Sequence, residues 1–140
     1  MTIRPAAVSG LFYPRERENV VRELGEFFDQ VDPGLPRPGF PKVIIAPHAG
    51  FIYSGSIAAR AYDLLRPARG IVRRVVMLCP CHRVAVRGMA LPGATAFDTP
   101  LGRVAVDTEA IRQVQGFPGL VDFPEAHRQE HAVEVQLPFL

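Results

Sequence analysis

The chain has 140 residues, of which 48% are hydrophobic and 21% charged, so we expect one globular domain and exclude global disorder. Sixteen basic and 14 acidic residues leave a net charge of +2, and the scattered arginines form no basic stripe that would indicate nucleic-acid binding. No stretch reaches the roughly 20 apolar residues of a membrane span, and the N-terminus lacks the apolar run of a signal peptide. With its two cysteines one residue apart, we expect a reduced, cytoplasmic protein.

The first predicted element is an amphipathic helix. Its apolar residues recur at the spacing of one helical face, and they are Val20, Val21, Leu24, Phe27, Phe28 and Val31. Asp32-Pro33-Gly34 is expected to end this helix, and a Pro-rich link to Pro41 follows.

Two continuous apolar runs follow, at residues 43–46 and 75–78. Because neither run alternates with polar residues, each predicts a strand buried on both faces, as in a parallel sheet. A helix is predicted between them over about residues 56–65, capped by Ser54 or Ser56. Its apolar stripe consists of Ile57, Ala61, Leu64 and Leu65. This order of strand, helix and strand predicts a right-handed parallel βαβ unit.

The remaining elements in the predicted order are shorter. Strands are expected near residues 88–91 and 104–106, and a helix over residues 109–114 with Asp107 or Thr108 as its cap.

A histidine follows each of the two predicted buried strands, His48 after the first and His82 after the second. Ligands of open α/β sheets bind beyond the carboxyl ends of the strands, and neighbouring parallel strands lie about 4.8 Å apart. The two imidazoles are therefore predicted to meet as metal ligands, since imidazole binds iron, zinc and copper well. The alternative is that each imidazole only hydrogen-bonds a turn. A metal would still need a third ligand.

A last helix is predicted from about Pro124, and it contains His127-Arg128-Gln129-Glu130-His131, the H-x-x-E-H pattern of one class of zinc peptidases. On one helical face both histidines would bind zinc and Glu130 would act as a base. Pro138 soon interrupts this helix and no carboxylate ligand follows, so we rank this hypothesis below the first. Its alternative is that one histidine faces solvent and the other lies near the cleft.

Two further groups lie near the predicted histidine pair. Cys79 and Cys81 precede His82, and their thiolates would suit a soft metal or a redox pair, although two small buried residues at a strand end is the simpler interpretation. Near His48, Tyr53 would add a phenolic donor to the rim.

Four segments carry a resemblance to a known family. They read AVSGLFYP at residues 7–14, IAPHAGFIYSG at 45–55, PCH at 80–82 and EHAVEVQLP at 130–138. In this order they resemble the motifs "AVAGxFYP", "APHAGYxYSG", "GPSHH" and "EHSLEVQLP" of the MEMO family. Its bacterial and archaeal members are called AmmeMemoRadiSam system protein B.

The resemblance implies an α/β fold, a three-layer sandwich with a mostly parallel central sheet. The fold is related to that of class III extradiol dioxygenases, non-heme iron enzymes that cleave catechol rings. The resemblance also implies that His48 and His82 are metal ligands, with iron as the expected metal and copper or zinc as alternatives. It also implies that His131 lies beside the metal or transfers a proton. The candidates for lining the substrate cleft are Tyr53, Cys81 and Glu134.

The expected function is that of a metal-binding, dioxygenase-like enzyme or redox protein, and the alternative is a non-enzymatic peptide- or protein-binding module. The implied partners are a small molecule or peptide, AMMECR-type and radical SAM proteins of the same system, and further copies of the chain. Family members are roughly twice as long, so we expect residues 1–140 to be the N-terminal half of one domain. The later half is expected to supply another histidine and a cysteine, without which this piece would be inactive and its site empty. Arg83 replaces the last histidine of "GPSHH" and is expected to point away from the metal.

Overall fold

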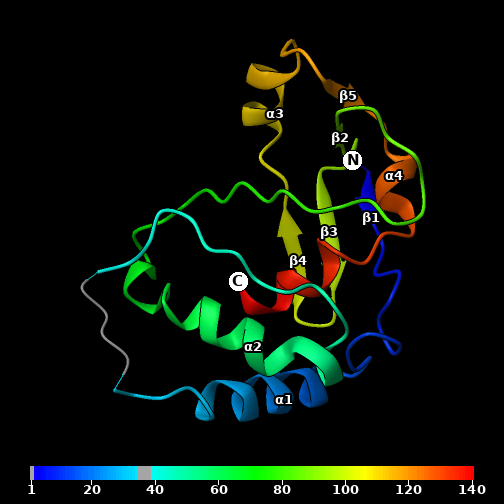
Figure 1. Ribbon diagram of the computed structural model, residues 1–140. Helices are drawn as coiled ribbons and strands as arrows, with labels where there is room; N and C mark the ends of the chain where they lie inside the picture. The colour runs from blue at the N-terminus through cyan, green and yellow to red at the C-terminus, as the bar shows by residue number, and fades with distance from the viewer. Residues whose placement is uncertain (1, 35–38) are drawn as a thin grey trace.

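The computed structural model describes residues 2–34 and 39–140, so part of the predicted Pro-rich link lies outside the described residues. The described part of the chain contains both helices and short strands, and parallel pairing occurs in two separate places. The predicted α/β class is confirmed. In Figure 1 the helices α1 and α2 lie on one side, and the strands lie on the other.

The predicted amphipathic helix is confirmed as α1, Arg17–Asp29. It packs against α2, Phe51–Asp63, at a very close approach. A Cβ atom on Gly55 would lie 2.3 Å from the ring of Phe27, so only glycine fits at this crossing. The ring of Phe27 also meets Phe51 edge-on, with 5.7 Å between ring centroids.

The second helix begins earlier than the sequence predicts. Gly50 is its N-cap residue, and the backbone N–H of Phe51 donates to the carbonyl of Phe12 at 2.7 Å. Ser54 therefore lies inside the helix and caps nothing, and the same holds for Ser56. The predicted stripe is also wrong at Ile57, which is half-exposed, because the buried face consists of residues Phe51, Ser54, Gly55, Ala58, Ala59, Tyr62 and Asp63.

Two small sheets contain the strands. In the first, β1 (Ile3–Arg4) pairs in parallel with β3 (Ala96–Thr99), which pairs antiparallel with β4 (Gly102–Ala105). In the second, β2 (Met89–Leu91) pairs in parallel with β5 (Leu120–Asp122). The strand predicted near residues 88–91 is confirmed, and the one predicted near residues 104–106 overlaps β4.

Short helices fill the rest of the chain. The predicted cap of α3 (Thr108–Val114) is confirmed, because the Asp107 carboxylate accepts from the N–H of Ala110 at 2.8 Å. The single helix predicted from Pro124 is wrong. That segment instead forms α4 (Glu125–Arg128) and, after a break, the 3-10 helix η2 (Glu134–Phe139). A second 3-10 turn, η1, covers Arg66–Ala68.

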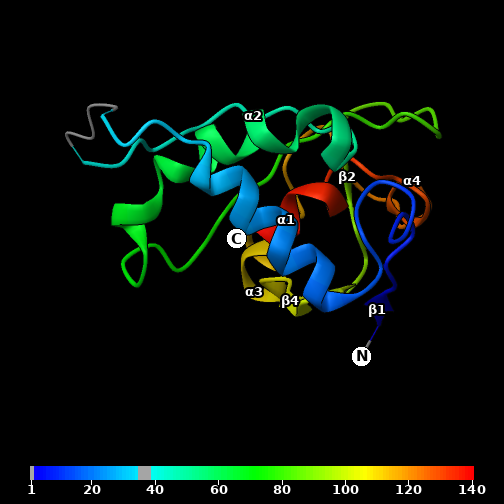
Figure 2. The same ribbon diagram turned by 90° about the horizontal axis from the view of Figure 1, so that it is seen from below.

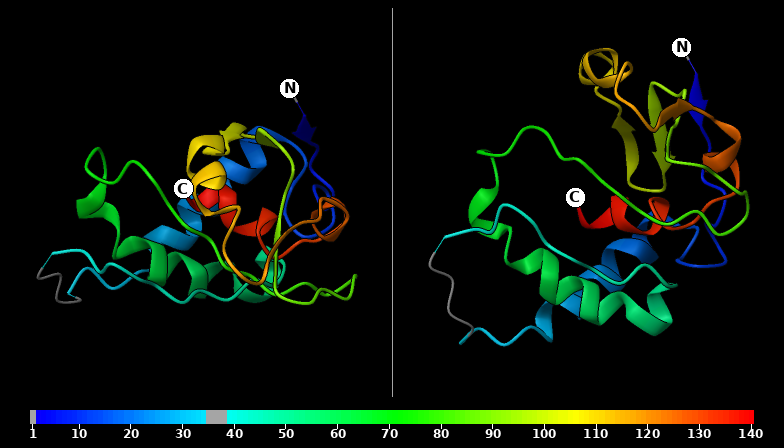
Figure 3. Two further views of the ribbon diagram at one scale, coloured as in Figure 1. Left: turned by 90° about the horizontal axis from the view of Figure 1, so that it is seen from above. Right: turned by 45° about the horizontal axis from the view of Figure 1, so that its top comes forward.

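The two predicted buried strands are not formed. Residues 43–46 and 75–78 have no regular secondary structure and pair with no strand among the described residues, and Figure 3 draws both as coil. Most of their side chains are exposed, to 94% at Ile45 and 76% at Leu78. A strand needs ladder partners and covered faces to be stable, and neither small sheet reaches these segments. The predicted βαβ unit is therefore wrong for this structure.

The core lies between the α1–α2 pair and η2. Its buried apolar members are Val8, Tyr13, Val20, Leu24, Phe51 and Val135. The 3-10 helix η2 contacts both α2 and β3, and in Figure 2 it is the red segment near the C-terminus. None of the helices in the described part of the chain has the length and hydropathy needed to span a bilayer.

Candidate metal centre

Three histidines from distant parts of the sequence converge at one place. His48 precedes α2, His82 lies in the bend after residues 75–78, and His131 lies between α4 and η2. Each offers a ring nitrogen, and these nitrogens lie within 4.8 Å of one another. The ring centroid of His82 lies 4.6 Å from that of His131 and 5.3 Å from that of His48. This histidine cluster is a candidate metal site.

The turn that carries His48 is held from two sides. The side-chain amide of Gln136 donates to the carbonyl of Pro47 at 2.9 Å, and the hydroxyl of Tyr62 donates to the amide oxygen of Gln136 at 2.8 Å. On the other side, Phe12 accepts the first N–H of α2. His48 is therefore fixed by tertiary contacts of its neighbours rather than by a sheet.

One carboxylate organises the other two histidines. Glu130 accepts from the backbone N–H of His82 at 2.6 Å and from its ring Nδ1 at 2.9 Å. It also accepts from the backbone N–H groups of His131 at 2.9 Å and Ala132 at 3.0 Å. Because Nδ1 of His82 donates to this carboxylate, its Nε2 keeps the free lone pair that a metal requires.

Glu130 is a permanent anion at neutral pH. Burial alone would raise its pKa, but the hydrogen bonds from His82 and Ala132 outweigh burial and lower the pKa to about 2. The Glu130 side chain is only 5% exposed, whereas that of His82 is 41% exposed, so the pair lies at the boundary between protein and solvent.

His131 is held in its neutral form. Burial lowers its pKa most, and the charges of His82, His48 and Arg83 lower it further, against an opposing effect of Glu130. A neutral imidazole is the form that binds metals.

The donor set fits a first-row transition metal. Three imidazole nitrogens, one of them oriented by a carboxylate, suit iron, copper or zinc, whereas magnesium and calcium prefer oxygen ligands. The sequence predicted His48 and His82 as metal ligands, His131 beside the metal or in proton transfer, and a further histidine beyond residue 140. In the structure, a ring nitrogen of His131 lies within 4.8 Å of those of His48 and His82, so His131 is itself a candidate ligand.

The predicted cleft residues have three different positions. Tyr53 is 83% exposed on α2, and no described contact joins it to the cluster. Cys81 is exposed, and its thiol lies 3.6 Å from the carbonyl of Ala126. It lines a cavity of about 650 Å³ beside the cluster, together with Cys79 and Glu130.

Glu134 is not a cleft residue, which corrects the interpretation from the sequence. Its side chain is fully buried and forms an ion pair with Arg4. It also accepts from the N–H groups of Ala7 at 2.9 Å and Val8 at 3.0 Å, and from the hydroxyl of Tyr13 at 2.7 Å. Its carboxylate therefore fastens the N-terminal segment to η2.

The zinc-peptidase hypothesis is contradicted by the same region. Helix α4 stops at Arg128, so His127 and His131 do not share a helical face. The Nε2 atom of His127 lies 2.8 Å from the carbonyl oxygen of Ala90, and His127 is not one of the three clustered histidines. The sequence contains the H-x-x-E-H pattern, but its two histidines do not lie on one helix as a zinc peptidase site requires.

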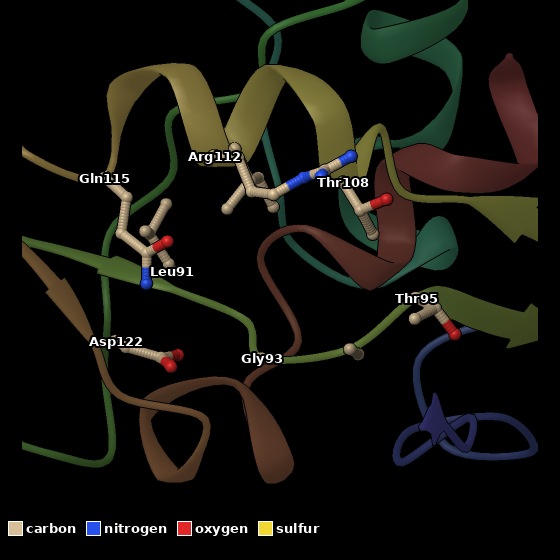
Figure 4. A pocket seen from close by; sticks show the side chains of 9 residues that line it. Leu91, Gly93, Thr95, Thr108, Arg112, Gln115 and Asp122 are labelled. Atoms are coloured by element: carbon tan, nitrogen blue, oxygen red, sulfur yellow. The ribbon is translucent and has the colours of Figure 1, made fainter. Parts of the chain in front are cut away.

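A second hollow lies between α3 and the β2–β5 sheet. Its volume is about 190 Å³, and in Figure 4 it is bordered by α3 above and by Asp122 and Gly93 below. Among the described residues, its lining includes no histidine or cysteine. The histidine cluster is therefore the stronger candidate site.

Comparison with known proteins identifies similar sequences across nearly the whole chain. The sequence profile of the family described as "Memo-like protein" matches residues 4–140. A MEMO1 family protein of Methanothermobacter thermautotrophicus is 40% identical over 144 aligned residues, which cover 99% of this chain and 52% of that protein.

Two further relatives show similar identity and coverage. A MEMO1 family protein of Aeropyrum pernix is 41% identical, covering all of this chain and 52% of the relative. One of Aquifex aeolicus is 36% identical, covering all of this chain and 50% of the relative. The chain spans about half the length of the curated relatives it matches.

Proposed function

The chain belongs to the Memo-like protein family, and from this premise we propose that His48, His82 and His131 bind a first-row transition metal for dioxygenase-like or other redox chemistry. The observation that carries the proposal is the convergence of three imidazole nitrogens within 4.8 Å. We propose iron as the metal, with copper and zinc as alternatives, because imidazole suits all three.

The chain's own residues would prepare the site in three ways. Glu130 orients His82 through two hydrogen bonds and fixes its tautomer. The lowered pKa of His131 keeps its imidazole neutral, which is the form that binds a metal. When bound, the metal would supply a Lewis acid and a redox centre.

The neighbouring cavity supports a small-molecule or peptide ligand. It has a volume of about 650 Å³ and contacts Glu130, and most of its lining side chains are apolar. A volume of this size suits a compact organic molecule. We propose that such a ligand enters beside Cys81, next to the histidine cluster.

A non-enzymatic binding module is the second candidate. It is favoured by Ile52 and Tyr53, two large side chains that are more than 80% exposed on α2. Exposed apolar clusters of this kind often mark protein-binding surfaces. AMMECR-type and radical SAM proteins are the partners we propose for this surface.

Metal analysis tests the proposal. The protein, purified without a histidine tag from iron-supplemented cells, is expected to contain close to one equivalent of metal. The variants His48→Ala, His82→Ala and His131→Ala should each lose most of it. The matched control is His127→Gln, because this histidine lies outside the cluster. Equal metal content in all four variants would overturn the proposal.

Oxygen uptake separates the two candidates. A metal-loaded protein that consumes oxygen with catechols supports the enzyme. A metal-loaded protein that turns over no catechol, and whose capture of partner proteins is abolished by Tyr53→Ala, supports the binding module.

A further inference from the structure

The segment AVSGLFYP at residues 7–14 contains no candidate metal ligand, yet it lies against the histidine cluster. The ring of Phe12 contacts the imidazole of His131, with 4.5 Å between centroids and 36° between planes. Figures 1 and 2 both draw the segment before α1 alongside α4 and the start of α2. Phe12 therefore covers one face of a candidate ligand.

The backbone of Phe12 contacts the segment of a second ligand. Its carbonyl accepts the N–H of Phe51 at 2.7 Å, just after the turn that carries His48. The approach is close, because a Cβ atom on Gly50 would lie 3.2 Å from that carbonyl oxygen. One residue thus touches the His131 ring with its side chain and the His48 turn with its main chain.

Phe12 is itself held firmly in place. Its N–H donates to the carbonyl of Val8 at 2.9 Å. The next residue, Tyr13, donates its hydroxyl to the buried carboxylate of Glu134, which also accepts the N–H of Val8. With partners on both sides, the Phe12 ring has a defined position against which His131 can rest.

We propose that Phe12 is a positioning residue of the metal centre, whose ring fixes the plane of the His131 imidazole and whose carbonyl fixes the turn that carries His48. The inference rests on the proposed function, because it assigns a role toward the metal. An aromatic ring tilted over an imidazole favours a limited set of orientations and excludes water from that face. Ligands held in advance need less ordering when a metal binds.

Substitution of the ring tests the proposal. Phe12→Leu keeps an apolar side chain but removes the aromatic contact, and cobalt(II) serves as a spectroscopic probe of binding. We expect the dissociation constant for cobalt to rise roughly 10-fold and its visible spectrum to change. Phe12→Tyr keeps the ring, so its dissociation constant for cobalt and its visible spectrum should match those of the unmodified protein.

The matched control is Leu11→Ala, since Leu11 is the neighbour of Phe12 and is 82% exposed. It should bind cobalt as the unmodified protein does. A second variant, Gly50→Ala, leaves the ring intact and presses a Cβ atom on the Phe12 carbonyl. We expect it to weaken cobalt binding several-fold, because it disturbs the main-chain contact between Phe12 and the turn that carries His48. Unmodified affinity and spectrum in both Phe12→Leu and Gly50→Ala would overturn the proposal.

Proton NMR of the metal-free protein tests this proposal separately from the proposed function. In the unmodified protein the ring current of Phe12 shifts the proton resonances of the His131 imidazole, and Phe12→Leu should remove that shift while the resonances of His127 stay in place. If the unmodified protein binds no cobalt but the shift is lost as expected, the proposed function fails and the contact stands. If cobalt binds and the His131 resonances do not move, the positioning role of Phe12 fails alone.

Discussion

Two glutamates four residues apart, Glu130 and Glu134, have similar burial and different roles. Each side chain is at most 5% exposed, and each carboxylate accepts four hydrogen bonds from the described residues. Glu134 faces a full cation, Arg4, deep in the core. Glu130 faces imidazoles at the rim of the histidine cluster.

The difference lies in what each carboxylate holds. Arg4 also donates to the carbonyls of His127 at 2.9 Å and Glu130 at 2.5 Å, so the pair of Arg4 and Glu134 anchors the backbone on which Glu130 stands. Glu134 therefore supports the fold, and Glu130 uses that support to orient histidines of the candidate metal site. The predictions below test whether stability and metal binding separate in this way.

The largest expected effect is on stability. Arg4→Ala leaves the Glu134 carboxylate buried without its charge partner, and we expect a loss of about 3–5 kcal/mol in the free energy of unfolding. Urea denaturation measures it. Glu26→Ala breaks the exposed pair with Arg22 and should have a far smaller effect. An equal effect of the two substitutions would contradict the anchoring role.

The second effect is on metal affinity. Glu130→Gln keeps the volume but loses the charge that orients His82, so we expect metal to bind roughly 10- to 100-fold more weakly. Titration with cobalt or zinc measures this change. The unfolding free energy should fall much less than in Arg4→Ala. The division of roles is wrong if Glu130→Gln unfolds the protein as readily as Arg4→Ala.

The third effect is on acid stability. The pKa of Glu130 is about 2 in the folded state, and an unfolded glutamate titrates near 4.3. Its carboxylate therefore stabilises the fold above about pH 4.3, and that contribution is lost as the pH falls toward 2. Glu130→Gln should flatten this part of the curve of urea midpoint against pH. Parallel curves for the two proteins would show that other groups dominate.

The smallest effect is on thiol reactivity. Burial raises the pKa of Cys79, and the charge of Glu130 raises it further, so less thiolate is present at pH 8. The exposed Cys81 should react faster with iodoacetamide, as read by mass spectrometry of the labelled peptides. In Glu130→Gln, labelling of Cys79 should speed up by roughly twofold, with Cys81 unchanged as the internal reference.

Local sequence signals predicted local structure well. The spacing of Val20 and Leu24 indicated α1, and Asp107 was recognisable as a cap because capping depends on residues three positions apart. The start of α2 was not predictable in this way. It is set by the carbonyl of Phe12, which lies 39 residues before its partner Phe51, and no local pattern reports such a contact.

The site was predicted in part, and with the wrong supporting structure. His48 and His82 do lie together, although the strands that were expected to bring them together are unpaired in this structure. The apolar runs predict strands from composition alone, whereas strand formation depends on partners elsewhere. Glu134 was misplaced for a related reason, since only the fold reveals that Arg4 lies beside it.

The pairing of Arg4 with Glu134 also has a consequence for the timing of assembly. The two residues are 130 positions apart, and a ribosome adds about 5–20 residues per second. His48 and His82 are therefore made on the order of several seconds before the anchor that supports Glu130 exists. The support that Arg4 and Glu134 give to the backbone of Glu130 can therefore form only after residue 134 has been made.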